Sequence, residues 1–195
     1  METCGISCML MALDYFKRVQ YPTPKQEEKL YSLYRCRAFK GTLGTAIALC
    51  LAKNRLNVEL LHSSPSWLDN HGGYYPEKLY RDILNEYKTV LESSSGLFRA
   101  EAGQTITLDL YREQLGLGRL LIVQCLVPGD MDIDGMHTQV LHWILVYGQT
   151  DGGFLCCDPL YGKIILSDAE MAEYTDTPVG KICLAVWEEQ PMGME

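Results

Sequence analysis

The sequence is short of positive charge and of histidine. It has 17 Lys and Arg residues against 25 Asp and Glu residues, which gives a formal net charge of −8, and it has only 4 histidines. A protein that binds the nucleic-acid backbone needs clustered Lys and Arg to neutralise phosphates. The composition therefore argues against a nucleic-acid partner. The histidine count leaves few candidates for a catalytic base.

Long apolar runs and a targeting pattern are also missing from the sequence. No apolar run reaches the ~18 residues that a membrane span needs. Met1 is followed by an acidic residue and not by the basic stretch of a secretory signal. We therefore expect no membrane contact and a cytoplasmic protein with reduced cysteines. Cys50, Cys125 and Cys183 lie in apolar runs and are expected to be buried.

The order of apolar patterns predicts one α+β domain. A chain of 195 residues can bury a single core, and no internal repeat calls for a second domain. Helical spacing and start signals predict helices near 6–18, 23–34, 42–54, 76–91 and 107–115, with a short strand near 57–64. Apolar runs predict strands near 116–128, 138–148, 154–159, 162–167 and 180–188, with a helix at 167–174. We expect a helical half (about 4–115) packed on an antiparallel sheet (about 117–188).

Two helix starts are marked by capping boxes. Thr23 and Gln26 flank Pro24 with the spacing of an N-cap and an N3 residue, and Ser167 and Glu170 repeat the pattern. In such a box each side chain accepts a hydrogen bond from the other residue's backbone N–H.

Cys4 stands at the start of a helix-like apolar run, and its role has to be inferred from the rest of the chain. It could be a packing residue, a metal ligand, half of a disulfide or a nucleophile. A thiol at the N-terminal end of a helix meets the positive end of the helix dipole, which stabilises a thiolate. Gly5 would let a substrate carbonyl approach closely. A nucleophilic cysteine also needs a base and a group that orients the base.

His142 and Asp158 are the best candidates for that base and orienting group. A hairpin tip at about Asp151-Gly152 would place residues 142–147 against residues 153–158. The two side chains would then be neighbours, and the carboxylate could fix the imidazole by a contact to Nδ1. This hypothesis makes Cys4 the nucleophile, His142 the base and Asp158 the orienter.

Each assignment has a structural alternative. His142 could be a strand-edge histidine bonded to a backbone carbonyl. Asp158 precedes Pro159, and an Asp-Pro pair often starts a turn. His137 is the rival base, but five positions from His142 it would lie on the opposite face of a strand, and we expect it in a loop. His62 and His71 are expected at the surface.

Two sequence patterns suggest metal sites, and neither is complete. Residues 130–135, DMDIDG, resemble the first half of an EF-hand loop, but position twelve is Leu141 and not Glu. These residues are more simply an acidic loop that would favour basic substrates. Cys4 and Cys8 on one side and Cys156 and Cys157 on the other do not form the paired ligand motifs of a zinc site. We expect no metal and no cofactor.

The motifs and their order resemble papain-like cysteine peptidases of the bacteriocin-leader (double-glycine) type. The shared elements are a Cys-Gly-x-x-Cys helix start, a His-Trp strand ending in Gly, and an Asp-Pro-x-x-Gly turn, covering about residues 4–162 apart from 63–105. The resemblance implies a papain-like fold with Cys4, His142 and Asp158 as its triad.

The chain departs from this family before the nucleophile. The family has a Gln several residues upstream whose amide helps to bind the oxyanion. Only three residues precede Cys4, and none is Gln. Either the natural chain starts further upstream, or another donor serves, or the oxyanion hole is incomplete. Among the other glutamines, Gln139 ranks first as a substitute because it lies closest to His142 in sequence.

The sequence therefore predicts a cysteine peptidase that acts on a peptide or protein. A papain-like acyltransferase, with an amine in place of water as acceptor, would use the same triad. A catalytically inactive binding domain is the third reading, which the missing Gln keeps open. The residues indicate neither the cleavage specificity nor the oligomeric state.

Overall fold

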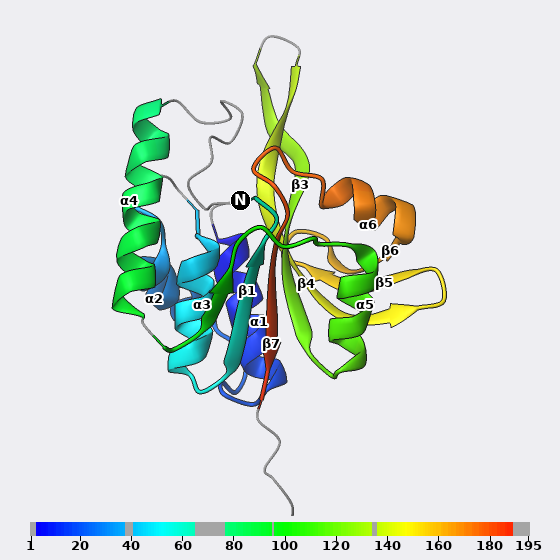
Figure 1. Cartoon of the computed structure of the whole chain (residues 1–195), viewed down its shortest axis with the longest axis horizontal. Helices are drawn as coiled ribbons and strands as arrows, with labels where there is room; N and C mark the ends of the chain where they lie inside the picture. Colours follow the sequence, from blue (N-terminus) through cyan, green and yellow to red (C-terminus); the bar gives the residue numbers. More distant parts are fainter. Residues whose placement is uncertain (1–2, 38–40, 65–76, 95, 134–135, 189–195) are drawn as a thin grey trace, which may run out of the picture.

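One sheet and six helices make up the described part of the chain (Figure 1). The computed structural model describes residues 3–37, 41–64, 77–94, 96–133 and 136–188, with side chains described outside residues 128–139. The helices are α1 (Cys4–Tyr15), α2 (Pro24–Tyr34), α3 (Gly44–Lys53), α4 (Glu77–Ser93), α5 (Leu108–Gly116) and α6 (Asp168–Tyr174). The strands are β1 (Asn57–His62), β2 (Arg99–Glu101), β3 (Leu120–Ile133), β4 (Met136–Thr150), β5 (Gly153–Asp158), β6 (Gly162–Ser167) and β7 (Ile182–Trp187).

The sheet is mixed, which corrects the expectation of a purely antiparallel one. Its strand order is β2-β1-β7-β3-β4-β5-β6. Strands β1 and β2 are parallel, because the chain between them crosses back through α4. The other pairs are antiparallel. The α+β class is confirmed. The short strand expected near 57–64 is β1, and β2 is a second strand of the helical half that was not expected.

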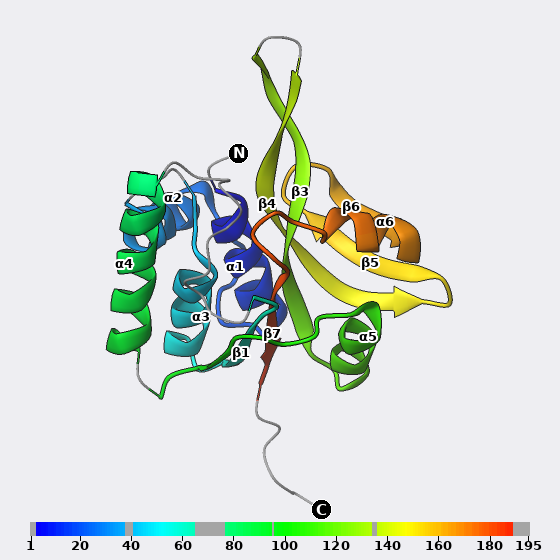
Figure 2. The same ribbon diagram turned by 45° about the horizontal axis from the view of Figure 1, so that its top comes forward.

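Helices cover both faces of the sheet. Helices α1 to α4 lie on one side and α5 and α6 on the other (Figures 1 and 2). Met9, Ile47 and Trp143 belong to the core under α1 and α3. Phe154 and Met171 belong to the core under α5 and α6. The sheet is therefore a central layer with apolar side chains on both of its faces.

Two helix starts were predicted correctly from local sequence signals. Thr23 accepts a hydrogen bond from the Gln26 backbone N–H, and the Gln26 side chain accepts one from the Thr23 N–H. Ser167 and Glu170 form the same reciprocal pair at the start of α6. Both predicted capping boxes are confirmed. Cys50, Cys125 and Cys183 are fully buried, as their apolar surroundings predicted.

Strands β3 and β4 form a long ribbon that extends beyond the rest of the sheet (Figure 2). The expected end of β3 at Pro128 is wrong, because the strand continues to Ile133 after a register shift between Pro128 and Asp132. A proline cannot donate to the strand ladder, so a break in pairing is expected there. The predicted acidic loop is thus largely strand. Its last two residues, Asp134 and Gly135, lie outside the described residues.

None of the six helices in the described ranges combines the length and the apolar character of a membrane-crossing helix.

Candidate active site

Cys4 is the first residue of α1 and is 7% exposed. The first backbone hydrogen bond of the helix runs from the Ser7 N–H to the Thr3 carbonyl, at 2.8 Å. Helix geometry therefore leaves the N–H groups of Cys4, Gly5 and Ile6 without intrahelical acceptors. Thr3 makes no side-chain cap hydrogen bond to these donors. As the first residue of α1, Cys4 has its thiol at the positive end of the helix dipole.

Gly5 allows Thr42, just before α3, and Trp143 of β4 to pack closely against α1. A Cβ atom at this position would lie 2.8 Å from Thr42 Cβ and 3.2 Å from Trp143 Cδ1. We expected Gly5 to admit a substrate carbonyl. The structure gives a different reason for the glycine, which is the packing of Thr42 and Trp143 against the first turn of α1.

His142 is fully buried on β4 and contacts Asp158 at the end of β5. The distance from His142 Nε2 to Asp158 Oδ1 is 3.0 Å, so the predicted neighbourhood of the two side chains is present. The expected ring atom was wrong, because Nε2 and not Nδ1 contacts the carboxylate. Among the described residues Nδ1 has no hydrogen-bond partner. The second nitrogen is therefore left for the neighbouring thiol.

The surroundings of His142 favour its protonated form. Burial alone would lower the pKa of His142, but the hydrogen bond to Asp158 and the interaction with Cys4 outweigh it and raise the pKa from 6.5 to about 9. The Cys4 side chain is thus one of the groups that act on the ring. Near neutral pH the imidazole thus carries a proton on each nitrogen, with Nε2–H donating to Asp158.

Asp158 accepts hydrogen bonds from three donors through one oxygen. Besides the imidazole, the backbone N–H groups of Leu160 and Tyr161 reach Oδ1 at 2.6 and 3.3 Å. Burial would raise the pKa of Asp158, but these donors and the charge of His142 lower it below its usual value. The carboxylate both holds the imidazole and shapes the turn that follows. The two readings of Asp158, orienter and turn residue, therefore apply together.

A β-bulge in β4 sets the face on which Asp158 lies. Near the hairpin tip Gly148 pairs with Leu155, but the next pair is Val146 with Cys156, so Tyr147 is an extra residue on β4. Continuing this register puts Asp158 opposite Ile144. Ile144 and His142 share a face because alternate residues of a strand do.

Without the bulge, the pairing would put Asp158 opposite Leu145, whose side chain packs in the other core, under α1 and α3. A shift of one residue exchanges the two faces of a strand. With all the residues of this hairpin present, the bulge is therefore required for the His142–Asp158 contact. The bulge was not predicted from the sequence, although Gly148 within the strand was a possible signal.

Trp143 fixes β4 to both neighbouring helices. Its indole N–H donates to the Thr42 carbonyl at 3.0 Å, just before α3. Its own carbonyl accepts from the Cys8 thiol at 3.3 Å, on α1. Cys8 is fully buried. Trp143, the residue next to His142, thus holds the helix that bears Cys4. No sequence pattern had indicated this role of Trp143.

The second oxyanion donor is not identified by the described side chains. Gln139 lies in β4 opposite Pro128, and its side chain is outside the described residues. His137 is likewise in β4, so its predicted loop position is wrong, and its side chain is not described either. Gln124 is buried opposite Trp143, and among the described residues its Oε1 has no partner.

His62 and His71 are the two remaining histidines, and both were expected at the surface. His62 is 2% exposed, and its Nδ1 accepts a hydrogen bond from the Ser64 N–H at 2.9 Å. The predicted surface position is wrong because β1 is an inner strand between β2 and β7. His71 lies outside the described residues. Within the ranges described, no three His, Cys, Asp or Glu side chains are grouped so as to hold a metal ion.

The chain matches no protein-family model, and a search of the curated proteins gave no match. The geometry of Cys4, His142 and Asp158 is consequently the basis for any functional assignment. It combines a thiol at a helix start, a protonated buried imidazole and a carboxylate that orients the ring.

Proposed function

We propose that this protein is a cysteine peptidase with a papain-like fold, acting through an acyl-thioester on Cys4. The observation that carries the proposal is the buried 3.0 Å contact between His142 Nε2 and Asp158 Oδ1 beside Cys4. This contact uses one ring nitrogen and leaves the other for the thiol. A nucleophile, a base and an orienting group are the parts that thiol-dependent acyl transfer requires.

The proposed reaction begins with the proton of the Cys4 thiol on His142 Nδ1. The Cys4 sulfur attacks the carbonyl carbon of the scissile peptide, and a C–S bond forms. When the C–N bond breaks, Nδ1–H gives its proton to the departing amine. Water then attacks the thioester, and Nδ1 accepts a proton from it. The C–S bond then breaks, the acid product leaves, and the initial state is restored, with the Cys4 proton on Nδ1.

The tetrahedral intermediate requires hydrogen-bond donors at its oxyanion. The Cys4 backbone N–H has no intrahelical acceptor and is the first donor in this proposal. Losing one of two such donors lowers the rate by about two to three decades in enzymes of this kind. The second donor therefore decides whether the enzyme is fast or slow, and not whether the triad can act.

The remaining parts of the proposal concern the substrate and the compartment. The substrate is a peptide or a protein, and the reaction needs no cofactor. Each of the eight cysteines lies in the described ranges, and each is a free thiol. Reduced thiols are typical of the cytoplasm, where we place the protein.

Peptide-library cleavage read by mass spectrometry tests the proposal. The wild-type chain should cleave a subset of the library, and Cys4→Ala should cleave none. Cys8→Ala is the matched control, one helical turn away and fully buried, and should keep most of the activity. If Cys8→Ala is inactive and Cys4→Ala active, the nucleophile has been assigned to the wrong thiol.

The same experiment separates the two alternatives. An acyltransferase would convert the library peptides to amides when an amine such as glycine amide is added, with little hydrolysis. An inactive binding domain would give no product under either condition, and its Cys4 would react with alkylating reagents no faster than free cysteine. Both outcomes would contradict a peptidase.

A further inference from the structure

The turn between β5 and β6 exposes two apolar side chains next to the candidate catalytic residues. Leu160 is 47% exposed and Tyr161 is 60% exposed, and they follow Asp158 by two and three residues. We call this pair the Leu160–Tyr161 lip. An apolar side chain stabilises a fold when it is buried away from water, so exposed apolar side chains contribute little to stability. Their position next to a functional carboxylate points to a role outside folding.

The lip is held in place by the residue that orients the imidazole. Asp158 Oδ1 accepts the backbone N–H groups of both lip residues and also contacts His142 Nε2. The turn closes where Asp158 pairs with Gly162, which has a φ of +76° that favours glycine. A single oxygen atom therefore connects the backbone of the lip to the base. The lip is positioned relative to the site and is not a loosely attached loop.

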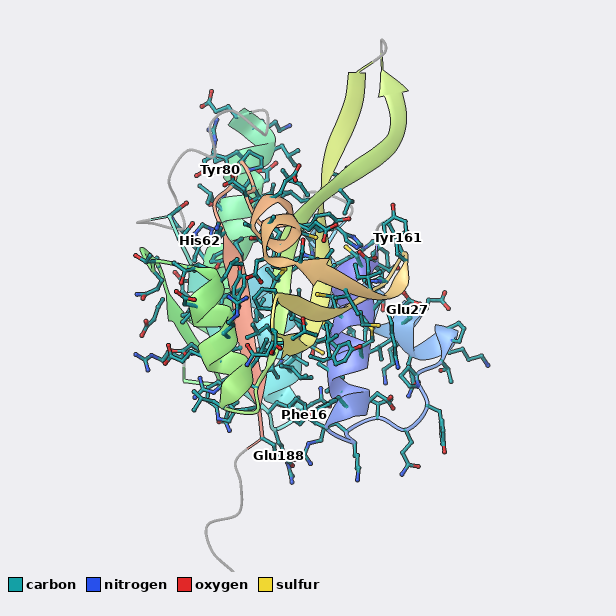
Figure 3. The ribbon with its side chains drawn as sticks, turned by 90° about the vertical axis from the view of Figure 1, so that its right-hand side faces the viewer. Phe16, Glu27, His62, Tyr80, Tyr161 and Glu188 are labelled. Atoms are coloured by element: carbon teal, nitrogen blue, oxygen red, sulfur yellow. The ribbon has the colours of Figure 1, made fainter. Side chains whose placement is uncertain are left out.

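The lip is linked to Cys4 through the candidate base. Asp158 Oδ1 accepts the N–H groups of the lip and contacts His142 at 3.0 Å, and Cys4 is among the groups that raise the pKa of His142. Figure 3 shows Tyr161 and Glu27 of α2 on the same side of that view. The lip therefore lies next to the residues that hold the imidazole beside Cys4.

We propose that the Leu160–Tyr161 lip binds an apolar or aromatic side chain of the peptide substrate, next to the bond that Cys4 attacks. This inference rests on the proposed function for its substrate and adds the substrate class. The occupant is argued from the continuity of the lip with the site through Asp158. When a large apolar side chain of the substrate is buried against these two residues, we expect a kcat/KM about tenfold or more higher than for a substrate with a small side chain there.

The first experiment measures the lip through the chemistry of Cys4 and needs no turnover. The wild-type chain is alkylated with iodoacetamide and, separately, with its N-phenyl derivative, and modification of Cys4 is followed by mass spectrometry. The ratio of the two second-order rate constants is compared with the ratio for glutathione. We expect the protein to favour the aromatic reagent by about tenfold more than glutathione does.

Three variants identify the side chains responsible. Leu160→Ala and Tyr161→Ala should each lower the ratio toward the glutathione value. Ile165→Ala is the matched control, because Ile165 is 67% exposed on β6 and lies ~13 Å further along the strand. It should leave the ratio unchanged. An equal ratio in all four proteins would overturn the proposal, as would a Cys4 that reacts with neither reagent.

The second experiment compares two peptides that differ only in one residue beside the cleaved bond, Phe or Ala. The wild type should have a kcat/KM about tenfold or more higher for the Phe peptide, and the lip variants should lose that difference. Failure of the proposed peptidase function can be distinguished from failure of the lip proposal. If only the peptidase function is wrong, the alkylation preference persists but no peptide is cleaved. A lip that instead pairs two copies of the chain would give a dimer in sedimentation, dissociated by Tyr161→Ala, and would also overturn the proposal.

Discussion

His142 is the residue whose chemistry the structure defines most closely. Its pKa of about 9 lies well above the ordinary value of 6.5. A histidine whose pKa is raised by folding stabilises the folded state fully below its unfolded pKa. That contribution is lost as the pH rises through the folded pKa. The relevant window is therefore between about pH 6.5 and about pH 9.

We predict that the wild type loses stability across this window and that His142→Gln does not. The loss should be on the order of 3 kcal/mol, since each unit of pKa difference corresponds to about 1.4 kcal/mol. Urea unfolding at pH 6, 7.5 and 9.5 measures it. Parallel profiles for His142→Gln and the wild type would contradict the assignment.

Asp158 should act on the rate through the imidazole that it holds. An Asn at this position can still accept the backbone N–H groups of Leu160 and Tyr161, but it lacks the negative charge. We predict that Asp158→Asn keeps the fold, lowers the pKa of His142 and reduces the cleavage rate by tenfold or more. The pH dependence of Cys4 alkylation would report the lowered pKa. Unchanged rates and an unchanged profile would leave Asp158 as a turn residue only.

At the scale of the elements, the packing of α1 against Thr42 and Trp143 depends on the absence of a side chain at Gly5. We predict that Gly5→Ala is destabilising, because overpacking costs about 1–3 kcal/mol and the gain in helix propensity is only about 1 kcal/mol. Gly116→Ala is the control, since a Cβ there would meet nothing within 4 Å. It should raise the stability slightly. Thermal unfolding of both variants measures the difference, and a stabilised Gly5→Ala would show that Thr42 and Trp143 yield easily.

The face on which Asp158 lies should be as important to the site as the catalytic side chains. Deleting Cys157 would leave Val146 paired with Cys156 and bring Asp158 opposite Leu145, on the other face, so we predict a loss of cleavage of at least about a hundredfold in protein that remains folded. Deleting Tyr147 removes only the bulged residue and leaves Asp158 opposite Ile144, so this variant should retain most of the activity. Circular dichroism and cleavage assays distinguish the two. Equal activity in both variants would show that β4 and β5 find another register.

At the scale of the whole molecule, local signals predicted more than long-range ones did. The capping boxes at Thr23 and Ser167 fixed two helix starts, because a cap is decided within four residues. The parallel pairing of β2 with β1 was not predictable, since it depends on a crossover of more than thirty residues whose pattern was the least readable. The burial of His62 was missed as well. It depends on the position of β1 between β2 and β7, which the parallel pairing with β2 creates.

The candidate site shows the same division. The residues Cys4, His142 and Asp158 could be selected from their types and order, and the hairpin brought the last two together. Two details were set by packing and were not readable in advance. The ring nitrogen that contacts Asp158 depends on the orientation of a buried side chain, and the shared face depends on the register of β4 and β5.

The central claim is that Cys4 forms an acyl-thioester, and intact-protein mass spectrometry tests it directly. The chain is mixed at pH 7 with the p-nitrophenyl ester of N-acetyl-phenylalanine, quenched in acid within seconds and digested to locate any adduct. We predict one acyl group on Cys4, a matching burst of p-nitrophenol, and no adduct in Cys4→Ala. An adduct confined to another thiol, or none alongside continued peptide cleavage, would contradict the account.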